Sequence, residues 1–168
     1  AGAYNGDTVL EFAKLVGNSY QGILAIEPSK RNYKRLLKNT EGLQNLSTFQ
    51  GAAWDSKEVL YFKDGRGRGS TLTTGEPNTR VNTIDALLEE IPGATASYIN
   101  YDVEGAEKQA LAGSVKTIQT HKPKLWISAY HRSRDLFALP LQVMDISPDY
   151  QLYYRHNPYI PAWDIQLL

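Results

Sequence analysis

The sequence predicts an α/β fold with a mostly parallel sheet, and three observations support this prediction. Short apolar runs typical of strands alternate with segments of helical periodicity along the 168 residues. A tight glycine turn at 1–6 leads directly into a helical segment. The apolar run at 22–26 follows it and ends in the acidic residue Glu27. Strands that alternate with helices are typical of a parallel-rich sheet with helices on both faces.

Composition limits the classes of function. Eighteen basic residues balance eighteen acidic ones, so no net charge favours a nucleic-acid partner or an anionic membrane. The chain has no cysteine, which excludes disulfides, thiolate metal sites and cysteine nucleophiles. No apolar run reaches the roughly 20 residues of a membrane span. We therefore expect one cytoplasmic domain over 1–168 that binds neither nucleic acid nor membrane. The oligomeric state stays open.

In the first half of the chain, residues 7–17 carry apolar side chains at helical spacing and end at a glycine typical of helix ends. The run at 22–26 indicates a fully buried strand. Pro28 and Ser29 begin a basic helix through Asn39, whose inner face is expected to carry Tyr33, Leu36 and Leu37. Two further strands are expected at 47–54 and 59–63. The Gly-, Thr- and Ser-rich segment 64–80 lacks apolar periodicity and is expected to be a long loop.

In the second half, the periodicity predicts helices over 84–91, 104–120 and 136–146. Apolar runs predict strands over 96–101, 124–130, 150–155 and 164–168. In sheets of this kind a glycine turn follows a central strand, but none precedes the turn at 1–6. We therefore expect that a first strand is missing from this chain.

Polar residues of a kind used in catalysis follow three of the predicted strands. They are Glu27 after the first strand, Asp102 and Glu104 after 96–101, and His131 after 124–130. Ligands of open α/β sheets bind outside the carboxyl ends of the strands, so these side chains are expected at one edge with the glycine turn. Glycine turn and carboxylate together indicate an adenosine-cofactor site. Each residue also has a structural interpretation: Glu27, Asp102 and Glu104 as helix-capping groups, and His131 as a surface histidine.

Several segments resemble known motifs. Residues 1–8 are similar to the first motif of class I S-adenosylmethionine methyltransferases, and 25–28 resemble the second motif. Residues 81–85 and 100–107 resemble the motifs of FkbM-type methyltransferases, above all the Asp-Val-Glu-Gly-Ala-Glu element at 102–107. The resemblance implies a Rossmann-like class I methyltransferase fold with a seven-stranded sheet and an antiparallel last strand. It also implies S-adenosylmethionine as cofactor and methylation of a hydroxyl oxygen.

The resemblance also implies site residues. The residues expected to bind the cofactor are Gly2, Ala3, Tyr4, Gly6, Glu27, Ala53, Trp54 and Asp102. Glu27 would hold the ribose hydroxyls, and Trp54 would offer a stacking face to adenine. The catalytic residues expected are His131 as general base, Asp102 and Glu104, with a small molecule or sugar hydroxyl as acceptor. We expect no metal, although the catalytic side chains have oxygen and nitrogen atoms of the kinds that bind metals.

Two other functions compete with methyl transfer. An NAD-dependent oxidoreductase also uses a glycine turn and a ribose-binding acid, but residues 2–6 lack the middle glycine that lets the backbone approach a pyrophosphate. A methyltransferase-like binding domain without turnover would keep the cofactor site and form no product.

Overall fold

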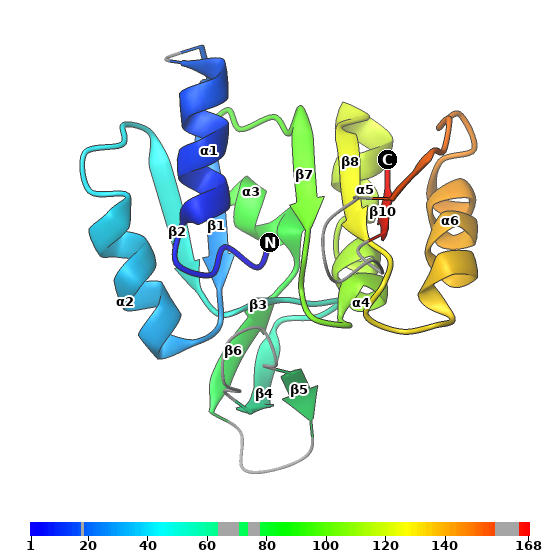
Figure 1. Ribbon diagram of the computed structural model, residues 1–168, viewed down its shortest axis with the longest axis horizontal. Helices are drawn as coiled ribbons and strands as arrows, with labels where there is room; N and C mark the ends of the chain where they lie inside the picture. Colours follow the sequence, from blue (N-terminus) through cyan, green and yellow to red (C-terminus); the bar gives the residue numbers. More distant parts are fainter. Residues whose placement is uncertain (18, 64–70, 74–77, 157–164) are drawn as a thin grey trace. The chain divides into compact units, whose positions relative to one another are not determined.

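The computed structural model describes residues 1–17, 19–63, 71–73, 78–156 and 165–168 (Figure 1). The chain forms two compact units. Unit 1 comprises Ala1–Ala52 and Glu58–Val81, and unit 2 comprises Ala53–Lys57 and Asn82–Leu168. No helix in the described ranges is long and apolar enough to cross a membrane.

Unit 1 begins with the expected order of helix, strand, helix and strand. The elements are α1 (Asp7–Val16), β1 (Ile23–Glu27), α2 (Lys30–Asn39) and β2 (Leu46–Gln50). Strands β1 and β2 pair in parallel, as predicted, with Ile23 opposite Leu46 and Glu27 opposite Gln50. The buried core of these elements consists of Ala3, Val9, Ala25 and Leu36. Burial is confined to the last three residues of β1, so the prediction of a fully buried strand is correct only for its carboxyl half.

The basic helix was predicted correctly except for one side chain. Ser29 caps it by accepting a hydrogen bond from the Asn32 backbone N–H, which explains why the helix begins there. Leu36 is buried, but Leu37 is 45% exposed, so its expected place on the inner face is wrong. Its neighbour in sequence occupies the core-facing position, and a step of one residue turns a helical side chain by about 100°. The basic side chains face solvent, as expected: Lys30, Arg31, Lys34, Arg35 and Lys38.

The strand expected at 47–54 is interrupted at Gly51, between β2 and β3 (Ala52–Ala53). A Cβ at position 51 would lie 2.3 Å from the Phe49 ring and 2.5 Å from the Arg80 carbonyl oxygen. Only glycine permits this close approach of the two backbone segments, so the apolar run bends where the sequence pattern indicated continuity.

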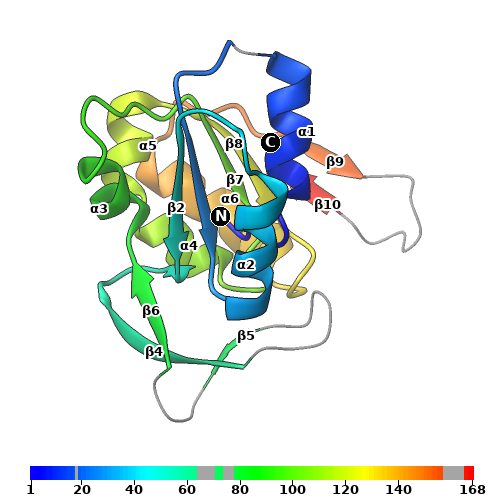
Figure 2. The same cartoon turned by 90° about the vertical axis from the view of Figure 1, so that its left-hand side faces the viewer.

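Part of the segment expected to be a loop forms antiparallel strands. Strand β4 (Glu58–Lys63), predicted at 59–63, pairs with β5 (Thr71–Thr73) and with β6 (Thr79–Asn82), in a sheet of order β3-β6-β4-β5. The Asn78 side chain bonds both the backbone N–H and the carbonyl of Phe62. Figure 2 shows these strands beyond the arrowheads of β1 and β2. The expected loop at 64–80 therefore holds two strands, and its remaining residues at 64–70 and 74–77 lie outside the described ranges.

Unit 2 contains a sheet of order β7-β8-β10-β9. Its strands are β7 (Tyr98–Tyr101), β8 (Lys124–Ser128), β9 (Tyr154–His156) and β10 (Ile165–Leu167). The pair β7–β8 is parallel, and β10 runs antiparallel to both β8 and β9. The antiparallel last strand agrees with that part of the expected fold. In the described ranges, the strands form one sheet of two and two sheets of four, rather than the single seven-stranded sheet that the resemblance implied. Each of the four strands is shorter than the apolar run that predicted it.

Four helices belong to unit 2 in the described ranges: α3 (Ile84–Glu89), α4 (Glu107–Ala112), α5 (Val115–His121) and α6 (Asp135–Ile146). Helix α4 packs against α6, and α3 packs against α5. The single helix expected at 104–120 is therefore wrong, because it is divided at Gly113 and Ser114. A Cβ at position 113 would lie 1.9 Å from the Trp54 carbonyl oxygen, so the backbone passes here too closely for any side chain.

Candidate functional site

The N-terminal turn of unit 1 is anchored to the end of β1. The backbone N–H groups of Gly2 and Ala3 both donate to the Ile26 carbonyl, at 3.0 and 2.9 Å. Tyr4 has a φ of 49°, in the left-handed region that non-glycine residues rarely adopt, and Gly6 before α1 has a φ of 88°. Strained backbone of this kind concentrates at ligand-binding segments.

Glu27 ties this turn to the segment that begins α2. Its Oε2 accepts a hydrogen bond from the Tyr4 backbone N–H at 2.8 Å, and its Oε1 accepts one from the Ser29 backbone N–H at 2.9 Å. The residue is 5% exposed. The structure thus brings Glu27 together with the glycine turn, as the sequence predicted. It also shows a structural role at the start of α2, which was the competing interpretation.

The chemistry of this group of atoms fits the ribose of an adenosine cofactor. A carboxylate has about four acceptor sites on its two oxygens, so an oxygen that accepts one backbone N–H can also accept a hydroxyl. A ribose diol presents two hydroxyl donors side by side. The carboxyl end of a parallel strand is also where open α/β sheets bind ligands.

Ala53 and Trp54 belong to unit 2, so their expected place beside adenine stays a prediction. Ala53 is buried, and Trp54 is half-buried. The Trp54 backbone N–H donates to the Asn82 carbonyl at 2.9 Å. Its backbone also passes close to Gly113, so two backbone contacts within unit 2 hold the main chain of Trp54.

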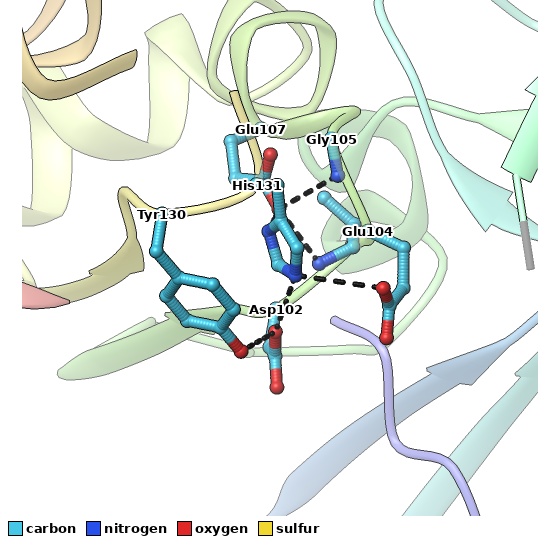
Figure 3. Close-up of polar contacts among 7 residues, drawn as sticks. Asp102, Glu104, Gly105, Glu107, Tyr130 and His131 are labelled. Atoms are coloured by element: carbon cyan, nitrogen blue, oxygen red, sulfur yellow. Dashed lines mark hydrogen bonds and ion pairs between the residues drawn. The ribbon is translucent and has the colours of Figure 1, made fainter. Parts of the chain in front are cut away.

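The catalytic residues expected from the sequence meet at the carboxyl ends of β7 and β8 (Figure 3). His131 Nε2 lies 3.6 Å from Asp102 Oδ1 and 3.5 Å from Glu104 Oε2. The side chain of His131 is 10% exposed, whereas those of Asp102 and Glu104 are 30% and 28% exposed. The imidazole is therefore largely enclosed, and its Nε2 faces two carboxylates that solvent reaches. The expectation that these three residues converge is confirmed, while their catalytic roles stay predictions.

Glu107 lies on the other side of the imidazole, and its role was not predicted from the sequence. Its Oε1 lies 2.9 Å from His131 Nδ1, and the side chain is 0% exposed. The same oxygen accepts hydrogen bonds from the backbone N–H groups of Val103 and Gly105, at 3.0 and 3.3 Å. It thereby closes the 103–105 loop, in which Glu104 adopts a φ of 53°.

Tyr130 was also not anticipated. Its hydroxyl donates to Asp102 Oδ1 at 3.5 Å, and its ring lies 4.3 Å from that of His131, centroid to centroid. The signal for both residues was present in the sequence. Tyr130 directly precedes the candidate histidine, and Glu107 closes the Asp-Val-Glu-Gly-Ala-Glu element. The contact of Glu107 with His131, and that of Tyr130 with Asp102, depend on how the 103–105 loop and the end of β8 fold.

The surroundings of His131 favour its protonated form. Burial lowers the pKa of His131, but the carboxylates of Glu107, Asp102 and Glu104 together outweigh burial and raise it above its ordinary value. The pKa of Asp135, at the start of α6, is raised, whereas a carboxylate in an ordinary ion pair has a lowered pKa. Burial and the nearby Glu107 raise the pKa of the Asp135 carboxyl. The guanidinium of Arg132 lies beside Gly105, where an added Cβ would be 3.1 Å from its Nε.

The raised pKa of His131 predicts a specific dependence of stability on pH. A histidine whose pKa is higher in the folded state stabilises that state fully below its unfolded value of about 6.5. This contribution is lost as pH rises through the folded pKa. We expect the difference in unfolding free energy between the native chain and His131→Gln to be largest near pH 6 and to shrink toward pH 9. Urea unfolding of both proteins across this range measures it, and a difference that grows with pH would contradict the assignment.

Comparison with known proteins, both by sequence and by structure, indicates the same family. The profile of the Methyltransferase FkbM domain family matches residues 1–153. The crystal structure of Methyltransferase FkbM from Methylobacillus flagellatus KT resembles this chain with a TM-score of 0.77 and 28% sequence identity. The similarity covers 99% of this chain and 41% of that chain, so this chain spans about two fifths of the length of its structural neighbour. No curated protein sequence matches it.

Proposed function

Because the chain belongs to the FkbM methyltransferase family, we propose that it transfers a methyl group from S-adenosylmethionine to a hydroxyl oxygen. The acceptor we propose is a small molecule or a sugar. The observation that carries the proposal is the enclosed His131 at the end of β8, with Nε2 facing Asp102 and Glu104 at the end of β7. A cytoplasmic location, and the lack of nucleic-acid and membrane partners, stay predictions.

Each proposed role follows from the chemistry of the residue. Glu27 accepts hydrogen bonds from the ribose hydroxyls, and Gly2, Ala3, Tyr4 and Gly6 form the backbone against which the cofactor lies. When bound, S-adenosylmethionine supplies an electrophilic methyl group and leaves as S-adenosylhomocysteine. An alcohol is a poor nucleophile until its proton is removed, and His131 Nε2 takes that proton as the oxygen–methyl bond forms. Asp102 and Glu104 accept hydrogen bonds that orient the acceptor, and they stabilise the imidazolium.

The experiment that tests the cofactor is a thermal shift with S-adenosylhomocysteine, with NAD as the comparison ligand. A ligand at 100 times its dissociation constant adds about 2.7 kcal/mol to stability. For a chain of this length, that raises the midpoint by about 5–10 °C. A shift with S-adenosylhomocysteine alone supports the proposal, and a shift with NAD alone contradicts it. Binding without methylation of any acceptor in a broad hydroxyl panel would indicate a binding domain instead.

Glu27→Gln is expected to remove most of the shift caused by S-adenosylhomocysteine. The amide nitrogen would face either a backbone N–H or a ribose hydroxyl where an acceptor is needed, at a cost of about 1–3 kcal/mol. Glu41→Ala, an exposed residue after α2, is the matched control and should retain the full shift. Each shift is measured against the ligand-free midpoint of the same variant, so a loss of stability alone does not count as a loss of binding.

A further inference from the structure

Glu107 is the most enclosed charged group at the candidate site, yet the proposed reaction uses it for no proton transfer. Its side chain is 0% exposed. Its Oε1 meets His131 Nδ1 and the backbone N–H groups of Val103 and Gly105. In the described part of the chain, its Oε2 is buried without a hydrogen-bond partner. A buried carboxylate is costly to place unless it interacts with donors or with a positive charge.

We propose that Glu107 is the positioning residue for His131: one oxygen both places a negative charge 2.9 Å from Nδ1 of the imidazole and closes the loop that carries Glu104. The consequence for catalysis rests on the proposed function, whereas the arrangement itself does not. The contact at Nδ1 is an ion pair, because in the described part of the chain the buried Nδ1 has no hydrogen-bond partner, and Nε2 is the nitrogen that faces Asp102 and Glu104. The negative charge of Glu107 then stabilises the imidazolium formed when Nε2 takes a proton.

The loop role follows from the same contacts. Glu104 has a φ of 53° and Gly105 one of 90°, so two successive residues lie in the left-handed region. For a glutamate this conformation costs about 1–3 kcal/mol unless the surroundings hold it. Hydrogen bonds from Val103 and Gly105 to Oε1 surround Glu104 on both sides and hold it there. Glu107 therefore determines both the charge beside the histidine and the position of a carboxylate that faces it.

Other charged groups contribute less to the state of His131. Asp102 and Glu104 lie farther from the ring and reach solvent, which screens their charge. Asp135, at the start of α6, has a pKa that burial and then the nearby Glu107 raise. The Tyr130 hydroxyl donates a hydrogen bond to Asp102, and the Arg132 guanidinium lies beside Gly105. Glu107 alone combines full burial with the shortest contact to the ring.

Glu107→Gln separates the charge from the geometry. The amide oxygen can keep the place of Oε1 and accept the same hydrogen bonds, while the NH2 group takes the place of the unpartnered Oε2. Glu107→Ala removes both the negative charge and the oxygen that accepts the hydrogen bonds. The chain has three histidines, so the imidazole C–H signals of the whole protein can be followed by NMR and assigned with His131→Gln. His121 and His156 serve as internal controls.

We expect Glu107→Gln to move the His131 titration midpoint down by about one unit or more, because an opposite charge at this distance shifts a pKa by about 1–3 units. Glu104→Gln, the matched control, should produce a smaller shift. Amide hydrogen exchange at Val103 and Gly105 should stay slow in Glu107→Gln and become fast in Glu107→Ala. If Glu107→Ala does not fold, the exchange rates of Glu107→Gln decide whether the loop is kept without the charge.

An unchanged His131 midpoint in Glu107→Gln would overturn the proposal, as would a shift no larger than that of Glu104→Gln. Fast exchange at Val103 and Gly105 in Glu107→Gln would overturn the assignment of the loop to the acceptor oxygen. These measurements need neither cofactor nor acceptor. A chain that transfers no methyl group can therefore still confirm the positioning role, and failure here leaves the thermal shift with S-adenosylhomocysteine unaffected.

Discussion

Replacement of His131 by glutamine is expected to lower kcat for methyl transfer by about 10²–10⁴-fold, the range that a general base contributes. The amide can occupy the space of the imidazole, but it cannot take a proton from the acceptor hydroxyl. Cofactor binding should change little, because the proposed ribose contact belongs to Glu27. The measurement is formation of S-adenosylhomocysteine with a hydroxyl acceptor that the native chain methylates.

The pH profile distinguishes a base from a merely structural histidine. In the native chain, kcat should rise with pH through the pKa of His131, which its carboxylate neighbours raise above the ordinary value of about 6.5. In His131→Gln this rise should disappear. His156→Gln, at an exposed position on β9, is the control and should keep both the rate and the profile. Native-like turnover by His131→Gln would exclude His131 as the base.

Gly113→Ala is expected to lower the free energy of unfolding by about 3 kcal/mol or more, beyond the usual cost of overpacking. The added Cβ would meet backbone atoms, with Trp54 O at 1.9 Å and Thr83 Cα at 3.2 Å, and backbone cannot turn aside as a side chain does. Any movement would also weaken the hydrogen bond from the Asp85 backbone N–H to the Gly113 carbonyl, 3.0 Å long. Urea unfolding measures the loss.

Gly22→Ala is the matched control for this prediction. A Cβ at position 22 would meet the Asn45 carbonyl oxygen at 3.4 Å, which is ordinary contact. The change in unfolding free energy should stay within about 1 kcal/mol, the size of the backbone-entropy effect of a compatible Gly→Ala replacement. Equal losses in the two variants would show that the close approach at Gly113 is relieved by movement of the chain.

Local patterns in the sequence were sufficient for most of the helices and strands and for most of the candidate site. Helical periodicity locates α2 and α3, and Ser29 marks the start of α2, because capping uses atoms only a few residues apart. The rule that ligands bind at the carboxyl ends of strands brought Asp102, Glu104 and His131 together before their distances were known. It also joined Glu27 to the glycine turn. These inferences need only the direction of each strand and the type of the residue that follows it.

The interruptions of predicted helices and strands, and the pairing of two unpredicted strands, depended on contacts between segments far apart in the chain. Gly51 and Gly113 interrupt apolar runs that look continuous, because the backbones of Arg80 and Trp54 pass close to them. The strands β5 and β6 form where periodicity is absent, because antiparallel pairing with β4 satisfies their backbone groups.

The sequence by itself determined the α/β class, the order of most elements and the residues at three of the strand ends, since periodicity and strand direction are local properties. Only the tertiary structure decided that Glu107 meets the Nδ1 atom of His131, while Glu104 and Asp102 meet Nε2. The physical reason is the left-handed turn at Glu104 and Gly105. That turn folds the 103–105 loop around the Glu107 carboxylate, and no periodicity in the sequence records it.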